Sequence, residues 1–257
     1  MDLLRGKTAV ITGAASGNGR AIAQSFAEQG GAIIVADVQS EPRQGGTPTH
    51  ELITEAGGDA TFVECDVTEY EDCVAAVEAA EEFGGIDVMV NNAGIVGPQG
   101  PLVELDFEEY QQLMDINLTG VFHGAKAAAL QMIEHGNGGS IINMSSVAGM
   151  NGYGEITPYS AAKGGTRLFS YALANELGPD GIRVNAVHPG VIETAMTVED
   201  QPVVGTEEGE QLKQMIPLRR FGDPEDVAGV CVFLASDLSS YVSAESIVVD
   251  GGNLNSS

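Results

Sequence analysis

Seven short β-prone runs are spread along this chain of 257 residues, and they constrain its fold more than any other feature. The segments between them are too long for hairpin turns and long enough for helical crossovers. Several runs are apolar throughout, which is typical of strands buried on both faces of a parallel sheet. The pattern predicts one doubly wound α/β domain, residues 1–257, with a seven-stranded parallel sheet and helices on both faces. The predicted strands are residues 7–11, 32–37, 60–65, 86–91, 140–144, 183–187 and 246–249.

Two segments interrupt this alternation. Residues 39–49 contain two prolines and paired glycines, which predict a loop after the second strand. Residues 194–215 mix acidic side chains with Val and Met, and they follow the carboxyl end of the sixth strand, where ligands bind in such sheets. We expect this second segment to be a mobile substrate lid; the alternative is a variable surface excursion.

The charge of the chain is strongly negative, with 37 acidic and 11 basic residues giving −26 at pH 7. Because phosphate backbones and anionic membranes attract Lys and Arg, we expect neither nucleic acid nor a membrane as partner. A 43% hydrophobic content with 34 glycines excludes a disordered acidic chain. Only four lysines occur, which favours a hydrated surface adapted to high salt and a halophilic source. The alternative is an ordinary acidic cytosolic protein.

Metal-binding and export signals are missing from the sequence. The three cysteines, Cys65, Cys73 and Cys231, form no CxxC pair, and the four histidines have no ligand spacing. We therefore expect no disulfide framework and no metal site. The first residues lack the pattern of a signal peptide, and no apolar run reaches the 18 residues of a membrane span. These features predict a cytoplasmic location.

A glycine-rich turn follows the first predicted strand. Gly13, Gly17 and Gly19 are spaced GxxxGxG, with Ser16 and Asn18 between them, and a helical pattern begins there. Glycines permit a tight strand-to-helix turn and let backbone N–H groups approach a pyrophosphate. The turn predicts a dinucleotide site of the Rossmann type, although glycine-rich turns also serve packing alone.

Asp37 ends the second predicted strand, 18 residues after Gly19. A carboxylate at this place can accept hydrogen bonds from an adenosine ribose and repels a 2′-phosphate, so it predicts NAD rather than NADP. Arg43 in the following loop could reverse that preference by pairing with a phosphate. Asp37 could also be a strand-end residue that caps a turn.

Tyr159 and Lys163 are four residues apart and so share one face of a predicted helix. A lysine ammonium beside a phenol lowers the phenol pKa from about 10 toward the working pH. Tyr159 is thus the candidate general acid and base. Lys163 is one of only four lysines in the chain, which argues against a surface charge without a specific role.

This tyrosine and lysine belong to a Tyr-Ser-Ala-Ala-Lys motif at residues 159–163, and two further motifs join it: Asn-Asn-Ala-Gly at residues 91–94 and Ser145-Ser146. With the glycine turn they resemble the short-chain dehydrogenase/reductase family. The resemblance covers essentially the whole chain, including residues 189–194, 222–227 and 249–252. It implies a Rossmann fold, a nicotinamide cofactor and a homotetramer built through the long helices and the C-terminal strand.

The resemblance also implies roles for individual residues. Ser146 polarises the substrate carbonyl, with neighbouring Ser145 as the alternative assignment, and Lys163 also holds the nicotinamide ribose. Asn117 matches the family position that bends a long helix and anchors a water leading from the lysine; otherwise it is a satisfied buried amide. The implied cofactor contacts are Asp66 and Val67 at the adenine, Asn92, Ala93 and Gly94 at the ribose side, Pro189 and Gly190 in the loop, and Ile192 and Thr194 at the carboxamide.

Together these motifs predict an NAD-dependent oxidoreductase that transfers hydride reversibly between the cofactor and a secondary alcohol or ketone, a small-molecule substrate. Alternative substrates are a 3-oxoacyl thioester and a sugar oxidised at C1, as in glucose 1-dehydrogenases. In a different class, the chain could be a nicotinamide-binding regulator without turnover. The substrate depends on residues 149–158 and on the lid, whose arrangement the sequence does not give.

Overall fold

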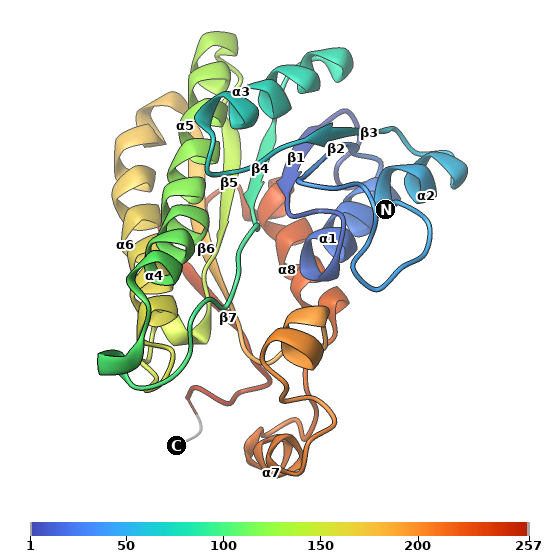
Figure 1. Ribbon diagram of the computed structural model, residues 1–257. Coiled ribbons are helices and arrows are strands. Elements are labelled where there is room, and N and C mark those ends of the chain that lie inside the picture. The colour runs from blue at the N-terminus through green and yellow to red at the C-terminus, as the bar shows by residue number, and fades with distance from the viewer. Residues whose placement is uncertain (1, 256–257) are drawn as a thin grey trace.

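The computed structural model of the protein describes residues 2–255 and contains a seven-stranded, all-parallel sheet with helices on both faces (Figure 1). The strand order is β3-β2-β1-β4-β5-β6-β7. This confirms the predicted doubly wound fold, with the strands shifted by a residue or two at their ends. The strands are β1 (Thr8–Thr12), β2 (Ala32–Asp37), β3 (Ala60–Glu64), β4 (Val88–Asn91), β5 (Gly139–Met144), β6 (Ile182–Pro189) and β7 (Ser246–Val249).

Helices fill the crossovers between the strands. They are α1 (Gly17–Glu28), α2 (Thr49–Glu55), α3 (Tyr70–Glu78), α4 (Phe107–Met114), α5 (Gly120–His135), α6 (Thr157–Leu177), α7 (Glu207–Met215) and α8 (Pro224–Ala235). In Figure 1, α1 and α8 cover one face of the sheet, and α3, α5 and α6 lie toward the other. A π-helical turn, Asp115–Thr119, joins α4 to α5.

The central strands of the sheet are buried on both faces, which explains why several of them are largely apolar. Ile11 of β1 belongs to the core against α1 and α8, whereas the preceding residue, Val10, belongs to the core against α3 and α5. Ile33 and Ile34 of β2 divide between the two cores in the same way. Successive side chains of a strand point to opposite faces, so a sheet covered on both sides favours apolar residues at consecutive positions instead of an apolar–polar alternation.

The direction of the chain reverses beside β1, and this reversal sets the place of the site. Strand β1 pairs in parallel with β2 on one side and with β4 on the other. The connections from β1 and from β4 therefore leave the sheet in opposite directions. In doubly wound sheets such a switch point opens a crevice at the carboxyl ends of the strands, where ligands bind.

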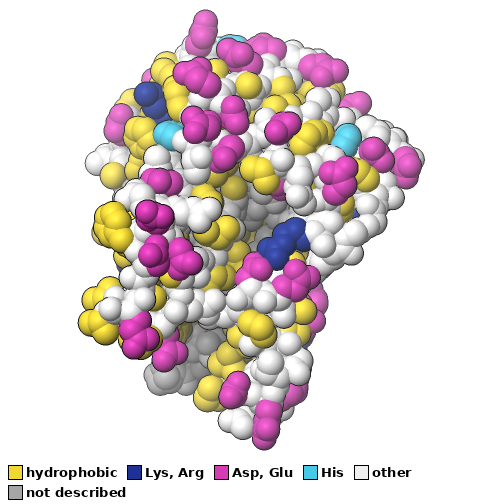
Figure 2. Space-filling view, in the orientation of Figure 1, with side chains coloured by type: hydrophobic (Ala, Val, Ile, Leu, Met, Phe, Trp, Pro, Cys, Tyr) yellow, Lys and Arg dark blue, Asp and Glu magenta, His cyan; other side chains and the backbone are white. Residues whose placement is uncertain are grey.

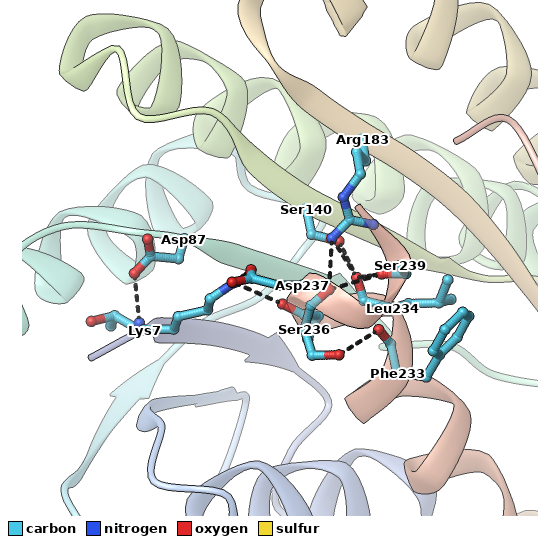
Figure 3. A network of polar contacts seen from close by, with 11 residues as sticks. Lys7, Asp87, Ser140, Arg183, Phe233, Leu234, Ser236, Asp237 and Ser239 are labelled. Carbon is cyan, nitrogen blue, oxygen red and sulfur yellow. Dashed lines mark hydrogen bonds and ion pairs between the residues drawn. The ribbon is translucent and has the colours of Figure 1, made fainter. Parts of the chain in front are cut away.

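A polar network joins the C-terminal end of α8 to the sheet near the amino ends of its strands, opposite the carboxyl ends (Figure 3). The carbonyl oxygen of Leu234 accepts hydrogen bonds from Arg183 of β6 at 2.8 Å and from Ser140 of β5 at 2.9 Å. Lys7, just before β1, pairs with Asp237 at 2.6 Å. Because the last carbonyls of a helix have no partner within it, these donors stabilise the end of α8 against the sheet.

The two interruptions take the following form. Residues 39–48 form an irregular loop as predicted, and Thr49, expected in the loop, is the first residue of α2. Residues 194–215 contain the π-helical turn Met196–Asp200 and α7, which projects from the rest of the molecule at the bottom of Figure 1. Among residues 2–255, no helix has the length and apolar character that crossing a membrane requires.

Candidate functional site

A cleft of about 530 Å³ opens at the carboxyl ends of the strands, at the switch point beside β1. Acidic side chains are spread over the face drawn in Figure 2, which is hollowed near its centre. All predicted site residues line the cleft except Gly19 and Asn117. The predicted residues that do so are Gly13, Ser16, Gly17, Asn18, Asp37, Asp66, Val67, Asn92, Ala93, Gly94, Ser146, Tyr159, Lys163, Pro189, Gly190, Ile192 and Thr194.

The glycine turn forms one wall of the cleft. Gly13 and Gly17 have φ values of +65° and +52°, which side-chain-bearing residues rarely adopt. Gly19 does not line the cleft, and a Cβ there would be 2.1 Å from the carbonyl oxygen of Gly13. The absence of a side chain at Gly19 lets α1 begin directly against its own turn, and a cofactor contact by its backbone stays a prediction.

Hydrogen bonds tie this turn to the end of β4. The Thr12 hydroxyl accepts from the backbone N–H groups of Asn92 at 3.0 Å and Ala93 at 3.1 Å. The Asn92 side chain donates in turn to the carbonyl oxygens of Thr12 at 2.9 Å and Gly13 at 3.2 Å. The two strand ends that flank the switch point are thus fixed relative to each other.

Asp37 lies at the adjoining end of β2. One of its carboxylate oxygens accepts a 2.9 Å hydrogen bond from the backbone N–H of Ala15 in the glycine turn. Burial raises the pKa of Asp37 above its usual range, and hydrogen bonds from the backbone N–H groups of Ala15, Val38 and Gln39 oppose that rise. Asp37 therefore caps the turn and also faces the cleft, so the two predicted roles are compatible.

Arg43 lines the same cleft and is already paired. Its guanidinium makes two hydrogen bonds to the carboxylate of Asp200, at 2.8 and 2.7 Å, and one of 3.1 Å to Glu199. Its backbone N–H donates to the hydroxyl of Ser16 at 2.8 Å. The loop after β2 is thereby tied to the 194–215 segment across the mouth of the cleft.

The two serines after β5 have different surroundings. Ser145 is buried, and its hydroxyl donates to the carbonyl oxygen of Lys163 at 2.8 Å. The hydroxyl of Ser146 accepts from the backbone N–H of Ala148 at 3.1 Å and makes a hydrogen bond with Tyr159. Of the two serines, Ser146 is thus the one whose hydroxyl meets the tyrosine.

Tyr159 and Lys163 lie in the first two turns of α6 and line the cleft. The lysine ammonium is 5.7 Å from the centre of the tyrosine ring. Burial raises the pKa of Tyr159, and the hydrogen bond with Ser146 opposes that rise. This differs from the expected lowering, because desolvation of the phenolate outweighs the other influences here. Burial also lowers the pKa of Lys163 to about 8, and its ammonium donates to the carbonyl oxygen of Met144 at 2.9 Å.

Asn117 is fully buried in the π-helical turn and does not line the cleft. Its side-chain oxygen accepts from the backbone N–H of Ile95 at 2.8 Å, and its side-chain nitrogen donates to the carbonyl oxygen of Ile95 at 2.7 Å. The same oxygen would lie 3.0 Å from a Cβ at Gly94. Asn117 therefore fixes the segment after β4 against the long helix rather than contacting the cleft.

Two pairs of predicted residues line the cleft from loops after strands: Asp66 and Val67 after β3, and Ile192 and Thr194 after β6. Asp66 is held by hydrogen bonds from Thr68, at 2.9 Å from the backbone and 2.7 Å from the hydroxyl, which leaves Val67 against the cleft wall. On the other side, the backbone N–H of Thr194 donates to the Thr197 hydroxyl at 3.1 Å. These local hydrogen bonds fix the two loops where they line the cleft.

Further residues line the cleft that the sequence motifs did not indicate: Val38, Gln39, Cys65, Ile95, Ile116, Met144, Ala195, Met196 and Thr197. Most of them are next to predicted residues in the sequence, and that adjacency is the only sequence feature that could have indicated them. Between residues 2 and 255, no three His, Cys, Asp or Glu side chains converge in the manner of a metal site.

The cleft, its glycine turn and the serine, tyrosine and lysine together define a nicotinamide-dependent oxidoreductase of the Rossmann type. A family profile described as Enoyl-(Acyl carrier protein) reductase matches residues 13–253. The chain belongs to the short-chain dehydrogenase/reductase family, and it acts on CH–OH groups with NAD or NADP.

Known proteins resemble the chain over nearly its full length. It is 39% identical to glucose 1-dehydrogenase 2 of Bacillus subtilis (strain 168) over 250 residues, which cover 97% of this chain and 95% of that protein. It is 40% identical to L-rhamnose 1-dehydrogenase (NAD(P)(+)) of Azotobacter vinelandii over 252 residues, 97% of each chain. Carveol dehydrogenase from Mycobacterium avium, solved in complex with NAD, superposes with a TM-score of 0.91 at 34% identity and covers 98% of this chain and 99% of that one.

Proposed function

We propose that this chain interconverts a secondary alcohol and a ketone with NAD as cofactor, using Ser146, Tyr159 and Lys163. The observation that carries the proposal is the meeting of the Ser146 and Tyr159 hydroxyls beside the Lys163 ammonium, in the same cleft as the glycine turn. Once a substrate oxygen takes the place of the hydrogen bond between them, the serine and the phenol can each donate one hydrogen bond to that oxygen.

The residues of the cleft fit a dinucleotide. The N-terminus of α1 faces it behind Gly13 and Gly17, whose left-handed backbone leaves room for a close approach of a pyrophosphate. The side-chain oxygen of Asn18 is buried without a hydrogen-bond partner among residues 2–255. Lys163 has three ammonium hydrogens and one hydrogen bond, to Met144, so donors remain for ribose hydroxyls.

The chemistry of the protein side chains is proton transfer and orientation. When bound, the nicotinamide supplies the carbon that gives or takes hydride. In ketone reduction, Ser146 donates a hydrogen bond to the carbonyl oxygen, and Tyr159 gives its proton to the oxygen as the alcohol forms. In alcohol oxidation, Tyr159 takes that proton back. The nearby Lys163 ammonium stabilises the tyrosinate that exists between these events.

The preference for NAD over NADP rests on Asp37. Its carboxylate faces the cleft next to the glycine turn and can accept hydrogen bonds from ribose hydroxyls. The 2′-phosphate of NADP carries about two negative charges, and the Asp37 carboxylate would repel it.

A sugar oxidised at C1 is the second candidate substrate. The similarity to glucose 1-dehydrogenase 2 and to L-rhamnose 1-dehydrogenase favours it over a 3-oxoacyl thioester. A cyclic sugar presents a ring C1–OH, so the same serine and tyrosine would serve without change.

We extend the proposal to the setting of the enzyme. Residues 194–215 act as a lid, and the chain forms a homotetramer in which α5 and α6 are covered. Four large apolar side chains that stand exposed on these helices support this assembly: Phe122, Leu130, Ile133 and Leu168. The net charge of −26 supports a cytoplasm of high salt as the working place.

The test is a panel of secondary alcohols, sugars and 3-oxoacyl thioesters with NAD(H) and NADP(H), in dilute buffer and in molar salt. We expect NAD-dependent turnover with an alcohol or a sugar, higher in molar salt. A strong preference for NADPH would contradict the argument from Asp37. NAD binding without turnover of any member would favour the regulator instead.

A further inference from the structure

One ion-pair cluster spans the mouth of the cleft. The guanidinium of Arg43 meets Asp200 through two hydrogen bonds of 2.7 and 2.8 Å, a planar arrangement that suits arginine, and meets Glu199 at 3.1 Å. The partners are 156 and 157 residues apart in sequence, so the contact joins two separate loops. Pairing with Arg43 lowers the pKa of Asp200, in keeping with an ionised carboxylate.

Arg43 lies where the adenosine end of a dinucleotide would bind. Its backbone N–H donates to Ser16 at the start of α1, at 2.8 Å, and both residues line the cleft with Asp37. An arginine beside the ribose-binding carboxylate is the side chain that could bind a 2′-phosphate. In this structure the guanidinium N–H groups of Arg43 donate instead to the carboxylates of Glu199 and Asp200.

We propose that Glu199 and Asp200 are cofactor-specificity residues: they occupy Arg43 and so withhold it from the 2′-phosphate of NADP. This rests on the proposed binding of NAD in the cleft. A carboxylate and a phosphate compete for the same planar fork of N–H donors. With Arg43 occupied, a 2′-phosphate meets Asp37 and both lid carboxylates, three negative groups against one positive group. Selectivity is then divided between the end of β2 and the segment after β6.

The test releases Arg43 without removing it. In Glu199→Gln/Asp200→Asn the guanidinium loses both charged partners, and we expect isothermal titration calorimetry to show NADP⁺ binding at least about tenfold tighter, with NAD⁺ changed less than about twofold. Adding Arg43→Gln to the double variant should abolish the gain, because the arginine itself must bind the phosphate. The substituted side chains are partly exposed, and a melting curve verifies that each variant is folded.

Glu208→Gln is the matched control, since it removes one negative charge from α7 of the same segment and leaves the Arg43 cluster intact. It should leave NADP⁺ affinity within about twofold of the wild type. Two outcomes would overturn the role of Glu199 and Asp200 even if the wild type prefers NAD⁺. They are a double variant with no gain in NADP⁺ affinity and a triple variant that keeps the gain. A wild type that binds NADP⁺ as tightly as NAD⁺ would overturn the proposed NAD preference, and this role with it.

Discussion

The ammonium of Lys163 lies 5.7 Å from the centre of the Tyr159 ring; the lysine is buried and the tyrosine is half-buried at the cleft. Desolvation acts against the charged form of each group: it lowers the pKa of Lys163 to about 8 and raises that of Tyr159. The buried Lys163 ammonium therefore costs stability, and it lies beside Tyr159, whose phenolate it can stabilise.

Lys163→Met should raise stability while it removes activity. The lysine pKa falls from 10.5 to about 8 in the folded protein, so below pH 8 the folded state holds its charge at a cost. Removing it should raise the free energy of unfolding by about 1 to 3 kcal/mol at pH 7. Because the cost disappears as pH rises from about 8 toward 10.5, the difference between variant and wild type should narrow over that range.

Urea unfolding at several pH values measures this difference. Lys213→Met is the control, because Lys213 pairs with Glu210 at the surface and should change stability by less than about 0.5 kcal/mol. A Lys163→Met variant less stable than the wild type at pH 7 would show that packing or the bond to Met144 dominates instead.

Ser146→Ala should move the pH profile of alcohol oxidation to higher pH. Oxidation needs an unprotonated Tyr159, so its kcat/KM rises as that phenol loses its proton. The Ser146 hydrogen bond opposes the upward shift of the tyrosine pKa, and its loss should raise that pKa further. Ser145→Ala is the matched comparison, because its hydroxyl bonds the Lys163 carbonyl and its loss should leave the rising limb in place. A limb that stays unmoved in both variants would be evidence against the Ser146 bond.

His188 supports the Ser146 backbone through a chain of hydrogen bonds, and its neutral form gives that chain one direction. A carbonyl oxygen only accepts, so Nδ1 of His188 carries the proton donated to Ser146 at 3.0 Å, and Nε2 accepts from Ser246 at 2.8 Å. The hydroxyl of Tyr171 then donates to Ser246 at 2.6 Å. This direction is that of the neutral imidazole, the form favoured by burial, which lowers the pKa of His188.

His188→Phe should lower both stability and turnover. We expect a loss of about 2 to 3 kcal/mol of unfolding free energy at pH 7.5, since buried polar partners are left unsatisfied. The folded pKa of the histidine is depressed, so wild-type stability should fall as pH drops below 6.5, and the variant should lose part of this slope. Ser246→Ala, which breaks only the outer link, should show a smaller loss. Equal pH slopes in wild type and His188→Phe would contradict a neutral buried histidine.

Gly19→Ala should destabilise the protein, whereas Gly229→Ala should stabilise it slightly. A Cβ at Gly19 would lie 2.1 Å from the Gly13 carbonyl oxygen, a backbone atom that cannot move without shifting the glycine turn. We expect a loss of about 2 kcal/mol or more and weaker NAD binding. Gly229 in α8 meets no atom within 4 Å of a Cβ, so alanine should add about 0.5 to 1 kcal/mol. Thermal melts compare the two, and equal effects would refute the packing role of Gly19.

Much of the site could be predicted because its residues stand at the ends of strands. A parallel sheet brings these ends to one edge, so Gly13, Asp37 and Ser146 share a cleft although they are far apart in sequence. The helical spacing of Tyr159 and Lys163 likewise placed both on one face of α6.

The remaining features depend on three-dimensional packing. The pairing of Arg43 with Asp200 joins loops whose paths no local pattern determines. The upward pKa shift of Tyr159 follows from its burial, which a spacing rule does not give. Gly19 and Asn117 belong to the expected motifs, yet close packing places them behind the cleft wall.

Tyr159→Phe tests the central claim most directly, because it removes one oxygen and leaves the ring. NAD⁺ affinity is measured by calorimetry and alcohol oxidation by the absorbance of NADH, with the best substrate of the panel. We predict NAD⁺ binding within about twofold of the wild type and a loss of turnover of about 10³-fold or more. Turnover within tenfold of the wild type, with NAD⁺ bound equally well, would contradict Tyr159 as the proton donor and acceptor of this site.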